Sequence, residues 1–335
     1  EMAKRAGRLY GIAVSNGTAA LDLALRVLGI GRGDEVLLPA FSYVATASMV
    51  VMQGARPVFA DVDPRNLCLD PVQTARRLSL RTRGVLCTDY GGNPCDYAKL
   101  SAICQRHGIP LIVDGAQSIG TLFDGRPALS YGTISTTSFH AAKTMTTIEG
   151  GMIFTDDAAI ARRLRMLRSQ GEDPGRKYYH IEIGHNFRMT EMQAAIGLMQ
   201  LEKLDRLLAA RQVLASRYHA HLAALGLPVP PGIPKSHNSY FLYALLVPQR
   251  DEIAARLKLQ GIETRSCYPL PLYRQPVFEH LKHEICQVAE QACQSILNPP
   301  MFFGMTSEQQ RRVARELAAA IEAIAPEHGE LRKAV

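Results

Sequence analysis

The sequence predicts an α/β fold, with a large domain built on a mostly parallel sheet and a smaller α+β domain after it. Short apolar runs rich in β-branched residues alternate with helical patterns up to about residue 200, as in a parallel sheet with crossover helices. A long helical pattern then leads to a Pro-rich stretch at residues 227–234. The 335 residues fit two domains at about 150 residues each, and we expect these over residues 1–205 and 206–335.

The strands of the large domain are predicted, in chain order, at residues 12–14, 35–38, 57–61, 84–88, 110–114, 134–139 and 151–155. Between them, apolar residues recur every three or four positions, as on the buried face of a helix. The first of these helices is predicted to start at Thr18, which is also a good N-cap residue. The first residues read as the middle of an element, so we expect an N-terminal segment before Glu1.

The remaining elements follow from the same patterns. The long helix is predicted from Thr190 to about residue 225. The small domain is predicted to hold a strand at residues 240–247, a helix at residues 251–260 and a closing helix from Ser307.

Composition excludes several classes of protein. There are 38 basic and 31 acidic residues, but the basic ones are scattered, and they do not alternate with aromatic residues as in a single-strand nucleic-acid groove. A net charge of +7 would suit a small anionic substrate. No apolar run approaches the roughly 18 residues of a membrane-spanning helix. We therefore expect neither a nucleic acid nor a membrane as partner.

Cysteine and histidine usage favours a reduced, metal-free protein. The seven cysteines are an odd number without a CxxC pair, which predicts free thiols and a cytoplasmic location. His280, His283 and Cys286 have a faintly metal-like spacing but lack a carboxylate motif, so we interpret them as part of a surface helix and expect no metal.

Four segments carry residues suited to chemistry, because ligands of α/β sheets bind where strands end. Residues 15–21 place a Ser-Asn-Gly turn before a helix, which is either a phosphate site or an ordinary helix cap. Asp114 ends a strand among small residues, where it could pair with a protonated ring nitrogen or cap a loop. Lys143, among small and hydroxyl residues, is either a Schiff-base nucleophile or a solvent-facing lysine. Asn186 lies in a turn before the long helix, where an Asn is usually structural.

The order of these segments resembles fold-type I enzymes that use pyridoxal 5′-phosphate (PLP), and more narrowly the DegT/StrS-type sugar aminotransferase family. The resemblance covers nearly the whole chain. It is carried by SNGTAALDLAL, GDEVLLPAFSYVATA, GARPVFADVD, IVDGAQSIG, SFHAAKTMTTIEGGMIFTDD, GHNFRMTEMQAAIGLMQLEKLD and GIETRSCYPLPLYRQPVFE.

The resemblance implies how the ring of the cofactor is held. Lys143 forms the Schiff base and moves protons at the substrate carbon, and Asp114 pairs with the pyridine nitrogen. Gln117 lies by the phenolic oxygen, and Tyr43 stacks on the ring.

The phosphate of the cofactor is implied to bind at the helix start. Thr18, Ala19 and Ser138 receive it, joined by Asn186 from a neighbouring subunit. The resemblance therefore also implies a homodimer with shared active sites.

The resemblance implies an aminotransferase that passes an amino group, with glutamate the expected donor, through pyridoxamine phosphate (PMP) to a keto sugar. A nucleotide-linked 3- or 4-keto-hexose is the expected acceptor, in amino-sugar biosynthesis for a polysaccharide or a secondary metabolite such as an antibiotic. A cyclitol (inosose) aminotransferase remains open. A PLP-dependent sugar dehydratase is disfavoured because such relatives carry His where this chain has Lys143. A non-catalytic regulator is disfavoured because no segment is left for an effector module.

Other patterns bear on the ligand. Gly29, Gly31 and Gly33 resemble a dinucleotide fingerprint, but a helix precedes and a strand follows them, the reverse of the required order. Three segments depart from the family pattern on its substrate side: Thr88-Asp89-Tyr90-Gly91, Ser266-Cys267-Tyr268-Pro269 and Arg168-Ser169-Gln170-Gly171. These departures leave the sugar open.

Overall fold

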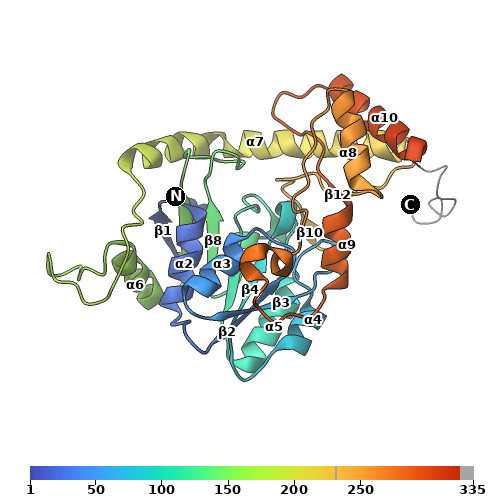
Figure 1. The fold of residues 1–335 in the computed structure, drawn as a ribbon. Helices are drawn as coiled ribbons and strands as arrows, with labels where there is room; N and C mark the ends of the chain where they lie inside the picture. Colours follow the sequence, from blue (N-terminus) through green and yellow to red (C-terminus); the bar gives the residue numbers. More distant parts are fainter. Residues whose placement is uncertain (231, 325–335) are drawn as a thin grey trace.

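The centre of the protein is a seven-stranded sheet with the strand order β1-β9-β8-β5-β4-β2-β3 (Figure 1). The structure is a computed structural model and describes residues 1–230 and 232–324. Strands β8, β5, β4, β2 and β3 pair in parallel, whereas β9 is antiparallel to both of its neighbours. The strands are β1 (Tyr10–Val14), β2 (Glu35–Pro39), β3 (Arg56–Ala60), β4 (Thr82–Thr88), β5 (Leu111–Asp114), β8 (Ile134–Ser138) and β9 (Gly151–Thr155).

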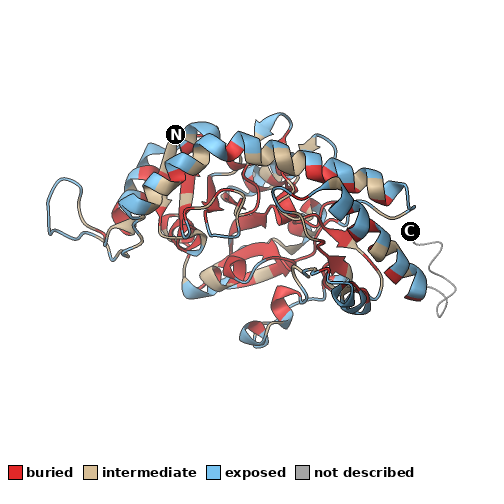
Figure 2. Ribbon diagram, turned by 90° about the horizontal axis from the view of Figure 1, so that it is seen from above, coloured by how far each residue is buried: buried red, intermediate tan, exposed pale blue. Residues whose placement is uncertain are grey.

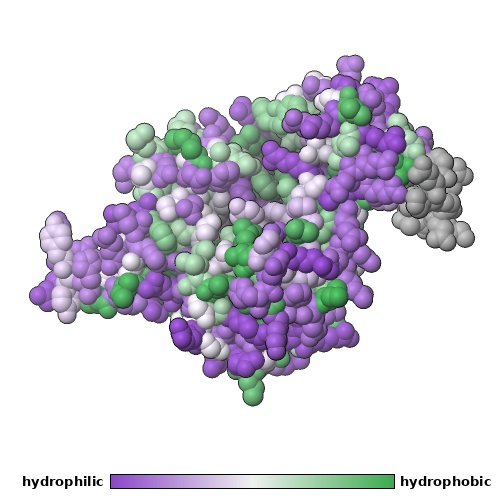
Figure 3. Space-filling model, viewed as in Figure 1, coloured by the Kyte–Doolittle hydropathy of each residue, from purple (hydrophilic) through white to green (hydrophobic). Residues whose placement is uncertain are grey.

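This sheet confirms the predicted fold class, and each predicted strand of the large domain is present with ends within two residues of the prediction. Strands β2 and β8 are buried at every position, because a parallel sheet carries helices on both faces. Figure 2 shows the same pattern, with buried residues along the strands and exposed ones on the outer faces of the helices. On the face drawn in Figure 3, hydrophilic residues dominate and apolar ones occur in small groups.

Six helices belong to the part of the chain before residue 170: α1 (Met2–Arg5), α2 (Gly17–Val27), α3 (Ala45–Met52), α4 (Pro71–Arg77), α5 (Tyr97–His107) and α6 (Ala158–Arg168). The predicted start of α2 was wrong by one residue. Asn16, not Thr18, is its N-cap, and the Asn16 side-chain oxygen accepts the amide of Ala19 at 2.8 Å. Asn caps helices at least as well as Thr, and it precedes Thr18 in the chain.

A long helix, α7 (Glu191–Ala223), connects the sheet to the C-terminal elements and runs across the top of the molecule in Figure 1. Thr190 and Gln193 form a capping box at its start, which confirms the predicted beginning of the helix. The predicted domain boundary at residues 205 and 206 lies inside α7, and the division into domains stays a prediction.

The C-terminal region contains α8 (Arg250–Leu259), α9 (Gln287–Ser295), α10 (Ser307–Ile324) and the paired strands β11 (Leu245–Leu246) and β12 (Ile296–Leu297). Leucine, isoleucine and tyrosine side chains of α7, α8 and α10 form a second hydrophobic core here. Three short strands, β6 (Leu122–Phe123), β7 (Arg126–Pro127) and β10 (Ser236–His237), form a separate sheet.

The predicted strand at residues 240–247 was wrong over most of its length, since only Leu245–Leu246 pair as a strand. Tyr240 has a positive φ of 52°, which no strand residue adopts. The carbonyls of Tyr240 and Phe241 instead accept hydrogen bonds from the Arg211 guanidinium, both at 2.7 Å. This side chain satisfies backbone groups that a sheet ladder would otherwise pair. Among the described residues, no helix is both long and apolar enough to cross a membrane.

Candidate active site

The carboxyl ends of three neighbouring strands bring the predicted residues together. Asp114 ends β5 and lies opposite Thr88 at the end of β4 and Thr136 in β8, whose last residue is Ser138. Because these strands are parallel, the polar residues at their ends share one edge of the sheet.

Asp114 is a buried carboxylate with few partners. Its side chain is 4% exposed, and it accepts hydrogen bonds from the amide of Ala116 (3.1 Å) and the hydroxyl of Thr46 (3.3 Å). Burial raises the pKa of Asp114, while the positive charge of Lys143 opposes that rise. A buried carboxylate with two neutral donors is best stabilised by a cation, and a protonated ring nitrogen would supply one.

Lys143 lies in the loop between β8 and β9 and is half-buried. Its ammonium group is 4.7 Å from the ring centroid of Phe241. Burial lowers the pKa of Lys143, and the charges of Asp114 and Cys267 partly offset this effect. A lysine with a lowered pKa is more often uncharged at neutral pH, as a nucleophilic amine has to be.

The first turn of α2 meets the end of β8 closely. A Cβ on Gly17 would lie only 2.9 Å from the Cβ of Ser138, so this approach requires glycine. Thr18 is exposed and Ala19 is buried. Although the amide of Ala19 donates to Asn16, the amides of Gly17 and Thr18 have no hydrogen-bond partner within the described ranges. Free helix amides beside a hydroxyl suit a phosphate group.

Gln117 and Tyr43 both lie next to Tyr268. Gln117 accepts the amide of Gly91 at 2.7 Å and donates to the Tyr268 hydroxyl at 2.9 Å. The ring of Tyr43 is 6.0 Å from that of Tyr268, and Tyr43 is 55% exposed. An aromatic face is therefore open above the end of the sheet. Together with the carboxylate, the amine and the free amides, it fits a phosphorylated pyridine.

Asn186 is exposed and lies at the base of an excursion between α6 and α7, seen at the far left of Figure 1. It forms a β-bridge with Ser169, and the carbonyl of the next residue, Phe187, accepts the amide of Ser15 at 2.8 Å. The segment is thus fixed beside the end of β1. The role of Asn186 toward another subunit stays a prediction.

Comparison with known protein families gives one match that covers almost the entire chain. The model of the DegT/DnrJ/EryC1/StrS aminotransferase family matches residues 1–318. The chain belongs to this family. The predictions of the family, of the fold class and of a PLP-dependent aminotransferase are confirmed.

The relatives of this chain include proteins named as sugar-modifying enzymes and one named as a regulatory protein. The chain is 38% identical to a pleiotropic regulatory protein of Geobacillus stearothermophilus, over 92% of this chain and 84% of that protein. It is 37% identical to the GDP-perosamine synthase of Caulobacter vibrioides, over 93% of this chain and 85% of that protein. The crystal structure of S. venezuelae DesV in complex with a ketimine intermediate superposes with a TM-score of 0.91 at 32% identity, covering 96% of this chain and 87% of that one.

Asp89 is a residue of this site that the sequence showed only as a departure from the family pattern. It is fully buried, and its carboxylate accepts hydrogen bonds from the Tyr97 hydroxyl (2.5 Å), the Ser118 hydroxyl (2.6 Å) and the Cys95 amide (3.1 Å). Its own amide donates to the carbonyl of Asp114 at 3.2 Å. Through this hydrogen bond, Asp89 helps to fix the backbone of Asp114.

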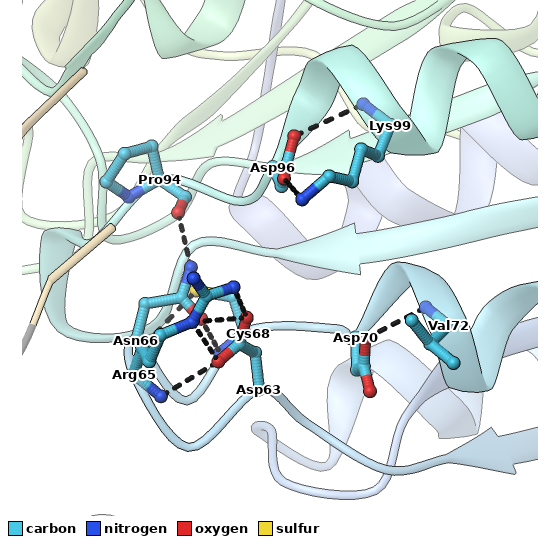
Figure 4. A network of polar contacts seen from close by, with 9 residues as sticks. All are labelled: Asp63, Arg65, Asn66, Cys68, Asp70, Val72, Pro94, Asp96 and Lys99. Atoms are coloured by element: carbon cyan, nitrogen blue, oxygen red, sulfur yellow. Dashed lines mark hydrogen bonds and ion pairs between the residues drawn. The ribbon is translucent and has the colours of Figure 1, made fainter. Parts of the chain in front are cut away.

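A neighbouring network of polar contacts, part of which is drawn in Figure 4, fixes the segment that leads to Cys95. The Asn66 side chain donates to the carbonyl of Pro94 at 2.9 Å, and the Cys68 thiol donates to the carbonyl of Asn93 at 3.4 Å. These bonds hold the segment whose next amide, that of Cys95, points at Asp89. No sequence motif indicates this arrangement.

We expect Asp89 to make stability depend on pH in the mildly acidic range. Burial raises the pKa of Asp89 to about 6, against the opposing effect of its hydrogen bonds. The folded state then binds the proton more tightly than the unfolded state, so the stability from this group is full below pH 4 and is lost as pH rises through 6. The free energy of unfolding of wild type and of Asp89→Asn can be measured in urea at pH 4.5 and at pH 7. We expect the stability of wild type relative to the variant to fall by roughly 2 kcal/mol from pH 4.5 to pH 7.

The matched variant Asp89→Ala separates charge from hydrogen bonding. It leaves three buried donors without an acceptor, and we expect it to be destabilised by roughly 3 kcal/mol or more at both pH values. A difference between wild type and Asp89→Asn that stays constant with pH would show that Asp89 does not titrate in this range.

Proposed function

We propose that this PLP-dependent aminotransferase transfers an amino group, with glutamate as donor, to a nucleotide-linked 3- or 4-keto-hexose. The observation that carries the proposal is the closeness of the buried Asp114 carboxylate to the half-buried amine of Lys143, since the charge of each affects the pKa of the other. The names of several relatives, including GDP-perosamine synthase, support a nucleotide-sugar acceptor. The setting would be amino-sugar biosynthesis in the cytoplasm, and the free cysteines support that location.

The residues of this crevice have distinct tasks. PLP, when bound, supplies a positively charged ring that accepts electron density from the bond broken at the substrate carbon. Asp114 holds the proton at the ring nitrogen, because the ionised carboxylate is stabilised by that charge. Lys143 would move protons at the substrate carbon, removing one from the donor in the first half-reaction and adding one to the acceptor carbon in the second, for which its lowered pKa is suited. Tyr43 and Gln117 would orient the ring, and Thr18, Ala19 and Ser138, with the free amide of Gly17, would bind the phosphate.

A panel of acceptors tests the proposal directly. The holoenzyme is incubated with glutamate and with keto-sugar nucleotides or inososes, and products are identified by mass spectrometry. Amination of a keto-sugar nucleotide supports the proposal, whereas amination of an inosose alone favours a cyclitol aminotransferase. Loss of a hydroxyl without gain of nitrogen would indicate a dehydratase, and no product from any acceptor of the panel would contradict the proposed acceptor.

We further propose that the working unit is a homodimer in which Asn186 of one chain reaches the phosphate bound by the other. Apolar side chains stand exposed along the outer face of α7 and on the excursion before it: Tyr178, Ile183, Met192, Leu198 and Met199. Exposed groups of this kind are typical of a surface that another chain covers.

Mixing two inactive variants tests the shared site. In a heterodimer of a Lys143→Ala chain and an Asn186→Ala chain, a shared arrangement leaves one site damaged at both positions and the other intact. We expect the equimolar mixture to recover about a quarter of wild-type activity, since half of randomly paired dimers are mixed. Activity no higher than that of the parents, with heterodimers shown to form, would place Asn186 in the site of its own chain.

A further inference from the structure

A cavity of about 550 Å³ lies at the amino-terminal ends of β2 and β3, where Glu35 and Arg56 begin these strands. Because β2, β4 and β5 are parallel, Asp114 at the end of β5 lies at the opposite edge of the sheet. Figure 1 shows β3 and α4 in the lower part of the molecule, away from α7 at the top. This amino-edge cavity is therefore separate from the cofactor site, and its volume is usual for small-molecule sites, roughly 300 to 1,000 Å³.

Positive charge dominates the lining of the amino-edge cavity. Its basic residues are Arg56, Arg76, Arg77, Arg81 and Lys282, together with His283. The acidic residues of the described lining are Glu35 and Glu284. With the histidine neutral, the lining carries an excess of three positive charges, which attracts anions. The arginines and the lysine come from three separate stretches of the chain, so the sequence alone does not show that they meet.

Glu35 holds two of the arginines in place. Its carboxylate is 2% exposed and accepts hydrogen bonds of 2.7 Å from the guanidinium groups of Arg56 and Arg81 and from the hydroxyl of Ser79. Burial alone would raise the pKa of Glu35, but these hydrogen bonds lower it to about 2, so the carboxylate is ionised at neutral pH. Each guanidinium gives Glu35 one hydrogen bond, and most of its five N–H donors remain available.

Arg77 is a nearly buried cation with a single partner. Its side chain is 13% exposed, and its guanidinium lies 3.1 Å from the carboxylate of Glu284, whose own side chain is 80% exposed. Taking a guanidinium out of water costs free energy unless its donors are satisfied. One contact with a largely exposed carboxylate satisfies little of this demand, whereas a bound anion would satisfy more of it.

The remaining two cations carry no partner that competes with a ligand. Arg76 belongs to α4, and Lys282 belongs to the segment that leads to α9. Both side chains are exposed, and within the described parts of the chain neither forms an ion pair or a side-chain hydrogen bond. An anion between them would join two parts of the sequence that lie far apart.

We propose that the amino-edge cavity binds a small anion with two or more phosphoryl groups, which Arg76, Arg77 and Lys282 contact. Arg56 and Arg81, fixed by Glu35, complete the site. Several separate cations match several phosphoryl groups, and an arginine can bind such oxygens in a bidentate manner. A small molecule fits better than a nucleic acid, because Phe59, the one Phe, Tyr or Trp of the described lining, is 1% exposed and cannot stack on a base.

Calorimetric titration of the holoenzyme with inorganic diphosphate tests the binding. We expect Arg76→Gln and Lys282→Gln each to weaken it by about fivefold, or about 1 kcal/mol. Both residues are exposed, so both variants should fold and keep the cofactor absorbance and the transamination rate of wild type. Arg162→Gln, which removes an exposed arginine of α6, is the matched control and should leave the affinity unchanged. Inorganic phosphate should bind at least tenfold more weakly than diphosphate.

Hydrogen exchange with mass spectrometry locates the bound anion. Diphosphate should slow the exchange of amides in residues 71–81 and 282–290 and leave residues 138–150, which include Lys143, unchanged. The same measurement on Arg76→Gln, at the diphosphate concentration that half-saturates wild type, should show less protection of residues 282–290.

Several results would overturn the proposal. Diphosphate that does not bind, or that binds wild type, Arg76→Gln and Lys282→Gln equally, would show that the cavity is only a solvated surface. Protection confined to residues 138–150 would place the anion in the cofactor site. Phosphate that binds as tightly as diphosphate would remove the requirement for a second phosphoryl group. A single-stranded oligonucleotide that binds more tightly than diphosphate, and loses affinity in Arg76→Gln, would make a nucleic acid the better ligand.

Discussion

Replacing Lys143 by alanine is expected to lower the rate of transamination by roughly 10⁴-fold or more, which corresponds to about 5.5 kcal/mol in the barrier. The variant loses both the amine that links to the cofactor and the base that moves the proton. Among the described residues, Lys143 is the lysine whose charge affects the pKa of Asp114. Borohydride reduction of the wild-type holoenzyme followed by peptide mapping should place the cofactor label on Lys143.

Two controls separate chemistry from folding. Lys177→Ala removes an exposed lysine, whose ammonium lies 5.1 Å from the ring centroid of Tyr178, and it should keep the label and nearly all activity. Lys143→Arg keeps the positive charge but not a free amine, and it should remain folded and inactive. A label on Lys177 or on any lysine other than Lys143 would contradict the assignment.

The fold could largely be predicted because its strands depend on local patterns. Strand β5 is buried at every position, so its sequence is a continuous apolar run, Leu-Ile-Val, that ends at the polar Asp114. The strand predicted at residues 240–247 failed for a non-local reason. The guanidinium of Arg211, which is 29 and 30 residues away in the chain, donates hydrogen bonds to the carbonyls of Tyr240 and Phe241.

Some residues of the candidate site could likewise be predicted from local patterns, and others could not. Asp114 could be identified because it is an ionisable residue at a strand end, followed by small residues. Lys143 could be identified because it is a lone lysine among small and hydroxyl residues. Tyr268 could not, because its partner Gln117 lies 151 residues away and no local pattern joins them. Asp89 was visible only as a departure from a family pattern, since no sequence pattern shows that the donors six, eight and 29 residues after it all point at its carboxylate.

Replacing Asp114 by asparagine is expected to retain bound cofactor and to slow transamination by roughly 10²- to 10³-fold, or about 3 to 4 kcal/mol. Asparagine has the shape of the carboxylate and can still accept from Ala116, but it carries no negative charge to keep the ring nitrogen protonated. The ring then accepts less of the negative charge that develops when the proton leaves the substrate carbon. Single-turnover rates with glutamate, normalised to the cofactor bound, measure the effect.

Thr46→Val is the matched control for this variant, because it removes one hydrogen bond to Asp114, of 3.3 Å, and leaves the charge in place. A neutral donor of that length contributes about 1 kcal/mol or less, so we expect a loss of no more than about fivefold. An Asp114→Asn variant that reacts within a few-fold of wild type would show that the carboxylate does not act through the ring nitrogen. A variant that loses cofactor but reacts normally in its bound fraction would instead give Asp114 a role in binding alone. The charge of Asp114, rather than its hydrogen bonds, must therefore account for most of the lost rate if it holds the nitrogen proton.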